Sequence, residues 1–135
     1  MKKLLVCSII LFIVNSCTSS YNTYPVSSTS NSEREYQEVL KTYKSETAEV
    51  LTYLLNGASP EEPKTALTVE NTSNCNMVLT VRGNNYFKRI PIGKGKIGSV
   101  MISKNQTYQL SGMVCKSSYQ TSKFISDSYS VKLSD

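Results

Sequence analysis

Apolar residues change their spacing along this chain, and the change predicts two kinds of structure. Between residues 32 and 56 they recur every three or four positions, which is the spacing of one face of a helix. From residue 65 to residue 135, short apolar runs alternate with polar residues and are separated by Gly- and Asn-rich turns, which is typical of strands. The pattern therefore predicts one long amphipathic helix followed by a β domain.

The predicted helix covers residues 32–56. Ser32 followed by Glu35 matches a capping box, so we expect Ser32 to be the N-cap, and Asn56-Gly57 ends the helix. The candidate interaction face is the apolar stripe of Tyr36, Leu40, Tyr43, Val50 and Leu54. We expect this stripe to pack on the β domain of the same chain. Self-association and docking on a partner are the alternatives.

The β domain is expected to span residues 65–135, after a Pro- and Glu-containing linker at residues 57–64. The expected strands are 66–70, 76–81, 86–92, 97–102, 107–114 and a last one within 123–133. Six or seven short strands separated by turns predict a small antiparallel β-sandwich or barrel.

The N-terminal segment has the pattern of an export signal. Two lysines precede an apolar run at residues 4–14, which is shorter than the ~20 residues that span a bilayer. Residues 1–16 are therefore predicted to be a signal peptide that ends before Cys17, which we expect to be lipidated. Residues 17–31 are rich in Ser and Thr and are predicted to form a disordered, lipidated tether. A plain signal peptide and an uncleaved short anchor are the alternatives.

The chain has four cysteines. Cys7 lies in the predicted signal and Cys17 takes the lipid, which leaves Cys75 and Cys115 in an exported protein. Because the compartments outside the cytoplasm are oxidising, we expect these two to form a disulfide, worth roughly 3–4 kcal/mol by loop closure. Two buried free thiols are the alternative.

Charge is unevenly distributed along the chain, whose formal net charge is +5. Residues 17–63 contain three basic and seven acidic residues, a net of −4, and residues 64–135 contain ten basic and three acidic residues, a net of +7. The candidate basic patch consists of Arg82, Lys88, Arg89, Lys94 and Lys96. Opposite charges also allow the helix to lie against the β domain.

Few residues in the chain are suited to catalysis. The absence of histidine excludes Ser-His-Asp and Cys-His catalysis and His-containing zinc sites. Glu70 and Asp127 are the one interior pair of acids in the β domain, and nothing in the sequence places them together. We therefore expect no enzyme, no metal and no cofactor, and export argues against a nucleic-acid partner.

Aromatic residues of the β domain have two interpretations. They are Tyr86, Phe87, Tyr108, Tyr119, Phe124 and Tyr129. Such side chains can form a ligand surface, but they more often fill a core and pair across strands. We expect the structural role for most of them.

Three segments carry a resemblance: PEEPKTALTVENTSNCNMVLTV (60–81), IPIGKGK (90–96) and YQLSGMVC (108–115). The layout resembles a small, uncharacterised lipoprotein family of the Bacteroidota, known mainly from flavobacteria as a domain of unknown function. The resemblance implies a lipid-anchored envelope protein with a disulfide-bearing β domain, and it implies no catalytic residue.

These features together predict an outer-membrane-anchored lipoprotein with a non-enzymatic binding or docking module. Because no acidic run follows Cys17, we expect the periplasmic face of the outer membrane. The expected partners are the membrane, through the lipid, and a protein or a cell-wall glycan. A periplasmic hydrolase inhibitor and a helix-docked subunit of an envelope assembly are the alternatives, and the oligomeric state stays open.

Overall fold

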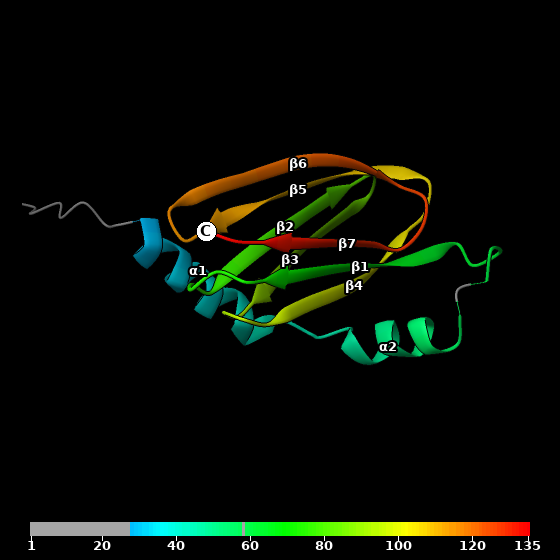
Figure 1. Cartoon of the computed structure of the whole chain (residues 1–135), viewed down its shortest axis with the longest axis horizontal. Coiled ribbons are helices and arrows are strands. Elements are labelled where there is room, and N and C mark those ends of the chain that lie inside the picture. Colours follow the sequence, from blue (N-terminus) through cyan, green and yellow to red (C-terminus); the bar gives the residue numbers. More distant parts are fainter. Residues whose placement is uncertain (1–27, 58) are drawn as a thin grey trace, which may run out of the picture.

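The chain folds into a mainly β structure with two helices ahead of the strands (Figure 1). The computed structural model describes residues 28–57 and 59–135. The predicted signal peptide, Cys17 and the tether up to residue 27 lie outside the described residues. The predicted fold class, a small β-sandwich preceded by helical structure, is confirmed.

Seven strands form two packed sheets. They are β1 (Lys64–Asn71), β2 (Met77–Gly83), β3 (Tyr86–Ile92), β4 (Ile97–Ser103), β5 (Gln106–Val114), β6 (Ser117–Ile125) and β7 (Tyr129–Leu133). The three-stranded sheet has the order β4-β1-β7 and the four-stranded sheet has the order β3-β2-β5-β6. The pairs are antiparallel as predicted, except that β7 runs parallel to β1.

The core lies between the two sheets because alternate residues of each strand face inward. Leu67 and Val69 of β1 face Leu79 and Val81 of β2, and all four are 0% exposed. Tyr108 of β5 is also fully buried, and its hydroxyl donates a hydrogen bond to the Ser103 carbonyl at 2.9 Å. The core is thus apolar, and its largest polar side chain has a partner.

The last expected strand, within residues 123–133, is β7, and the same range also contains the end of β6, with a bend between the two. Most of β6 was missed, because Ser, Thr and Gln dominate it and no apolar alternation marks it. The other five strands lie within two residues of their predicted bounds.

Two helices replace the single one that the sequence predicted. They are α1 (Ser28–Thr42) and α2 (Thr47–Leu55), separated by the connector 43–46. Ser32 is an interior residue of α1 and not an N-cap, because the helix begins four residues earlier. The backbone N–H of Thr47, the first residue of α2, donates to the Ser45 hydroxyl at 3.2 Å, so a side chain of the connector satisfies this N–H at the start of α2.

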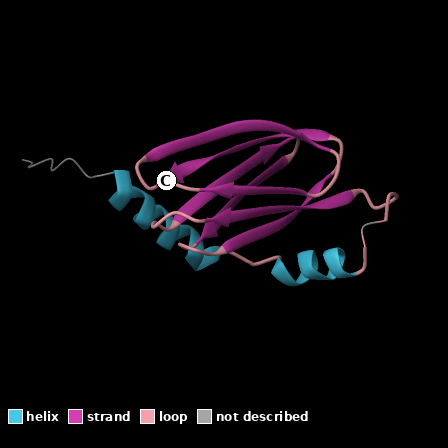
Figure 2. Ribbon diagram, in the orientation of Figure 1, coloured by secondary structure: helices cyan, strands magenta, loops and turns pink. Residues whose placement is uncertain are grey.

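Both helices lie on the side of the sandwich where β3 and β4 are the edge strands (Figures 1 and 2). Contacts join α1 to β2 and β3, and α2 to β4 and β1. Val78 of β2 and Ala66 of β1 alternate with the inward residues, yet they are only 3% and 1% exposed. The helices therefore bury apolar residues on the outer faces of the sheets. None of the described helices has the length and apolar content needed to cross a bilayer.

The predicted disulfide between Cys75 and Cys115 is confirmed, with a Cα–Cα distance of 5.3 Å. Cys75 lies in the loop between β1 and β2, and Cys115 lies in the turn between β5 and β6. Cys115 has a φ of 55°, in the left-handed region that a tight turn can require. The bond joins segments 40 positions apart in sequence.

Asn71 connects two loops at the same end of the sandwich. Its side-chain amide is 0% exposed and donates to the carbonyls of Cys75 at 2.8 Å and Ile92 at 3.1 Å. Its Oδ1 accepts from the Ser73 hydroxyl at 2.6 Å. The sequence predicted only a turn at this residue, whereas the structure places a buried polar hub there.

Candidate functional site

The predicted interaction face of the helices is divided between the core and the surface. Val50 is buried against the sheet, Tyr43 packs on the core, and Tyr36 is half-buried. Leu40 and Leu54 are 45% and 51% exposed. The break at the connector turns the two helices differently, so the five residues do not form one continuous stripe.

A second set of leucines is more exposed than the predicted one. Leu51 and Leu55 of α2 are 52% and 83% exposed, and with Leu54 they lie on one flank of the helix, three and four positions apart. This leucine flank is the largest apolar feature of the helices that faces away from the sandwich. In the sequence pattern, Leu51 and Leu55 lie at the edges of the apolar stripe, beside the five residues chosen as the interaction face.

The candidate basic patch is not a single surface. Arg89 forms an ion pair with Glu35 of α1, and Lys88 forms one with Glu46 of the connector at 2.8 Å. Arg82 lies with its guanidinium carbon 5.5 Å from the ring centroid of Phe87. The remaining two residues, Lys94 and Lys96, are exposed around the β3–β4 turn. Glutamates of α1 and of the connector thus neutralise part of the predicted patch.

The connector lies against β3. The ammonium group of Lys88 lies 5.5 Å from the ring centroid of Tyr43 as well as beside Glu46. Burial raises the pKa of Tyr86, and the negative charge of Glu46 adds to the rise. Burial and Glu46 raise the pKa of Tyr43 in the same way. The hydroxyls of Tyr43 and Tyr86 therefore keep their protons to a higher pH than an exposed tyrosine does.

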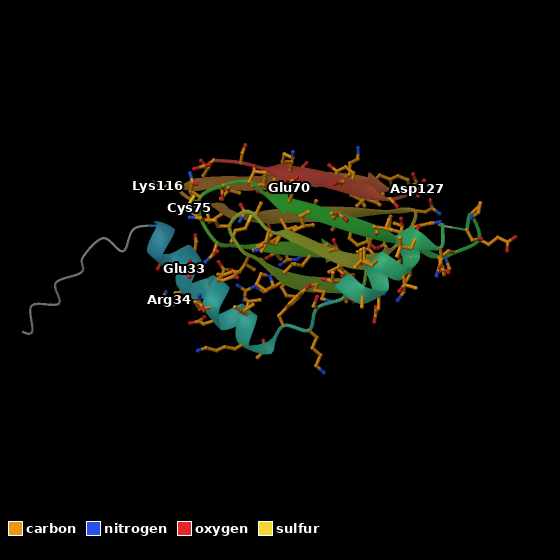
Figure 3. All side chains as sticks on the ribbon, turned by 60° about the horizontal axis from the view of Figure 1, so that its bottom comes forward. Glu33, Arg34, Glu70, Cys75, Lys116 and Asp127 are labelled. Carbon is orange, nitrogen blue, oxygen red and sulfur yellow. A yellow bond between two sulfur atoms is a disulfide. The ribbon has the colours of Figure 1, made fainter. Side chains whose placement is uncertain are left out.

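The pair of acids that the sequence singled out is far apart. Figure 3 shows Glu70 midway along the sandwich and Asp127 at the end opposite Cys75. Glu70 lies 3.4 Å from the Lys132 ammonium group, whereas the Asp127 carboxylate accepts a hydrogen bond from the Ser128 N–H. Within residues 28–57 and 59–135, no cluster of three His, Cys, Asp or Glu side chains could hold a metal ion. Glu70 and Asp127 therefore do not form a pair.

A polar surface lies on the outer face of the four-stranded sheet. Residues directly opposite each other in antiparallel strands point to the same face of the sheet, and two rows of such residues run across all four strands. One row is Phe87–Arg82–Gln109–Ser122, the next is Arg89–Thr80–Ser111–Gln120, and the pair Thr107–Phe124 borders the first row. We name these residues the polar platform. Its rows lie about 7 Å apart and the four strands span about 15 Å, given the usual spacings in a sheet.

Two exposed phenylalanines mark opposite edges of the platform. Phe87 on β3 is 59% exposed and Phe124 on β6 is 58% exposed. Tyr108 is buried in the core, and Tyr86, Tyr119 and Tyr129 pack against it. The structural role expected for most aromatic residues therefore holds for the tyrosines, and the phenylalanines are the exceptions.

A cleft of about 500 Å³ runs beside the platform, between α1 and β3. Its lining is Glu38, Val39, Thr42, Tyr43, Lys44, Phe87, Lys88 and Arg89. Phe87 belongs to both surfaces, so the cleft opens onto one edge of the platform. The cleft carries both charges, whereas the platform side chains other than Arg82 and Arg89 are hydroxyls, amides and the two phenylalanine rings.

The platform has the chemistry of a surface that holds a hydroxylated ligand. Amide and hydroxyl side chains donate and accept hydrogen bonds, and Arg82 adds a fixed fork of donors. Phenylalanine rings offer apolar area for the less polar face of such a ligand. Sequence reasoning missed the platform, because its members come from four strands. The alternation of Gln109 and Ser111 in β5, and of Gln120 and Ser122 in β6, was the available signal.

The chain belongs to the family described as "Domain of unknown function (DUF6759)", whose model matches residues 40–135. The match includes α2, all seven strands and both cysteines of the disulfide. The expectation of an uncharacterised domain is therefore confirmed. No curated protein matches the chain.

Two solved structures are similar to part of the chain. One is the crystal structure of a DUF3823 family protein from Parabacteroides merdae, at a TM-score of 0.42 and 12% identity, covering 55% of this chain and 46% of that one. The other is the TIE protein of Bacillus anthracis, at a TM-score of 0.42 and 10% identity, covering 54% of this chain and 16% of that one. The chain spans less than half the length of each.

Proposed function

We propose that this chain is a lipid-anchored cell-envelope protein whose β-sandwich is a non-enzymatic module that binds a glycan on the polar platform. The observation that carries the proposal is the strip of hydroxyl and amide side chains between Phe87 and Phe124, with Arg82 in its first row. A sugar chain presents hydroxyl groups along its edges and apolar C–H faces, so it matches this mixture of donors, acceptors and rings.

The envelope location rests on the sequence. Residues 1–16 have the charge and apolar run of an export signal, and Cys17 follows it. Acyl chains on Cys17 would anchor the protein at the outer membrane. The periplasmic face is expected because no acidic run follows Cys17. Cell-wall glycan is the polymer available on that face. Intact mass of the chain from envelopes tests the anchor, and an uncleaved, unmodified N-terminus would contradict it.

The binding test compares the native chain with Phe87→Ala/Phe124→Ala. We expect the native protein to co-sediment with purified peptidoglycan, and the double variant to lose at least tenfold in affinity. Leu51→Ala/Leu55→Ala, on the leucine flank of α2, is the matched control and should bind as the native chain does. Circular dichroism checks that all proteins are folded. Equal binding by the platform variant, or no binding to peptidoglycan by the native chain, would contradict the proposal.

A second candidate function is a helix-docked subunit of an envelope assembly. The exposed leucine flank favours it, because apolar side chains on a helix flank suit the groove of a partner protein. Cross-linking in native envelopes separates the two functions. Loss of a defined protein partner in Leu51→Glu/Leu55→Glu, with an unchanged Phe87→Ala/Phe124→Ala variant, would favour the docked subunit.

A further inference from the structure

The two sheets have four edge strands, and three of them carry protection against pairing with another chain. β3 contains Pro91 and the paired Lys88, and the connector lies beside it. α2 lies against β4. β7 is only five residues long. Proline, charge, short length and a covering helix are the usual means by which proteins prevent edge-to-edge association.

The fourth edge strand, β6, has almost none of these features. It is nine residues long, contains no proline and pairs with β5 along its whole length. Among the described strands none lies on its other side, and β6 forms the upper border of the molecule in Figure 1. Its one charge, Lys123, lies over the ring of Tyr129, with Nζ 5.3 Å from the centroid. The backbone groups along this edge are a template for a further strand.

The sequence of β6 is complementary to itself when two copies run antiparallel. The register of greatest overlap pairs Thr121, the midpoint of the strand, with its own counterpart. In that register Tyr119 faces Lys123 of the other copy and Gln120 faces Ser122. No like charges meet, and the central pairs are polar residues that can hydrogen-bond across strands.

We propose that two copies of this chain associate through an antiparallel β6–β6 pair, which joins their four-stranded sheets into one sheet of eight strands across a two-fold axis. The platforms of the two copies then lie on one continuous face, since Ser122 and Phe124 border the axis. A single pair of strands buries little area, so the dimer is weak in dilute solution and is favoured where the chain is concentrated. The inference does not depend on what the platform binds.

Cysteine cross-linking tests the register in the full chain. Directly opposite Cβ atoms lie about 5 Å apart, whereas diagonal ones lie about 7–8 Å apart. We therefore expect Thr121→Cys to cross-link with itself under mild oxidation. Gln120→Cys and Ser122→Cys should cross-link when mixed, and far less when each is alone. The unsubstituted chain is the background control, because it retains Cys7 and Cys17.

Sedimentation equilibrium tests the association itself. Thr121→Lys places two lysines opposite each other on the axis, and we expect it to weaken dimerisation at least tenfold. Ser130→Lys puts the same charge on the other open edge strand, β7, and should dimerise as the native chain does. A native chain that stays monomeric at millimolar concentration would overturn the proposal. Cross-linking no greater than background, or equal loss in both lysine variants, would overturn it as well.

Discussion

The two long sides of the sandwich are held in different ways. On the β3–β4 side, two helices and their connector cover the edges, through contacts that include the Glu35–Arg89 and Glu46–Lys88 ion pairs. On the β6–β7 side no described element covers the edges, and the disulfide at Cys115 fixes the turn that leads into β6. One side is closed by many weak contacts, and the other is left open but is covalently held.

On the covered side, ion pairs between two oppositely charged segments of the chain lie where a further strand could otherwise pair. Residues 17–63 carry a net of −4 and residues 64–135 a net of +7, and the ion pairs join glutamates of the first segment to cations of the second. Each partly exposed ion pair contributes at most about 1 kcal/mol. The covered side therefore depends on the sum of its contacts. The open side has the disulfide at one end in addition to its strand pairing, and the predictions below test that contrast.

The largest expected effect is loss of the disulfide. Cys75→Ser/Cys115→Ser removes a constraint on the unfolded chain and should lower the free energy of unfolding by roughly 3–4 kcal/mol. Urea denaturation of the native and double-variant proteins measures the change. A decrease below about 1 kcal/mol would mean that the open side does not depend on the covalent bond.

Asn71→Ala tests the polar hub between the loops. The substitution leaves the carbonyls of Cys75 and Ile92 without their donor and should cost about 2–3 kcal/mol. Asn74→Ala, at an exposed residue of the same loop, should change stability by less than about 0.5 kcal/mol. Thermal unfolding of both variants gives the comparison, and equal losses would show that the buried amide has no special role.

Glu46→Gln tests the connector on the covered side. Its partner Lys88 is 24% exposed and would lose its counter-charge, so we expect a loss of about 1 kcal/mol in low salt. High salt should reduce the difference. Glu49→Gln on the exposed side of α2 is the control. An equal effect of both substitutions in urea denaturation would contradict the specific pairing.

Tyr86→Phe should have an effect as small as that of Glu46→Gln, but its sign is favourable. Among the described residues, the Tyr86 hydroxyl is buried without a hydrogen-bond partner, so its removal should stabilise the fold by about 1 kcal/mol. The ring contact with Tyr108, at 5.9 Å between centroids, is kept. Chemical denaturation at pH 7 measures the gain, and a loss of stability would reveal a partner for the hydroxyl.

Alkaline pH provides a second measurement on the same tyrosine. Because burial raises the pKa of Tyr86 and Tyr43 in the folded state, the native protein is stable below their ordinary value of 10.0 and loses stability as pH rises above it. The Tyr86→Phe variant should lose less stability between about pH 9 and pH 11, because a tyrosine in the unfolded chain has a pKa of about 10 and ionises in that range. Identical pH profiles would contradict the assignment.

Sequence patterns predicted the parts of the fold that have an apolar period. Five strands of the β domain have regular runs or alternation, and the cysteine count left one pair for the disulfide. The pattern failed for β6, because a strand at an open edge has few apolar residues to mark it. It also failed at the connector, where Tyr43 continues the helical spacing but packs on the core from outside a helix.

The candidate site was harder to predict than the fold. Sequence analysis grouped Arg82, Lys88 and Arg89 because they are close in the chain. Neighbours in a strand point to opposite faces, so Lys88 meets Glu46, while the next residue, Arg89, shares the platform face with Arg82 of β2. The platform itself depends on register across four strands, which hydrogen bonding and core packing set together. No single segment contains that information.

The disulfide lies at the end of the sandwich where α1 begins, so the two ends of the molecule should differ in their resistance to force. Asn76, next to Cys75, donates to the Glu33 carboxylate near the start of α1 at 3.1 Å, and Figure 3 shows Glu33 at the same end as Cys75 and Lys116. A tensile force applied ahead of α1 therefore enters the sandwich beside its cross-link. The helix contacts bear that load first and can peel one at a time, while the strands behind the disulfide stay in register.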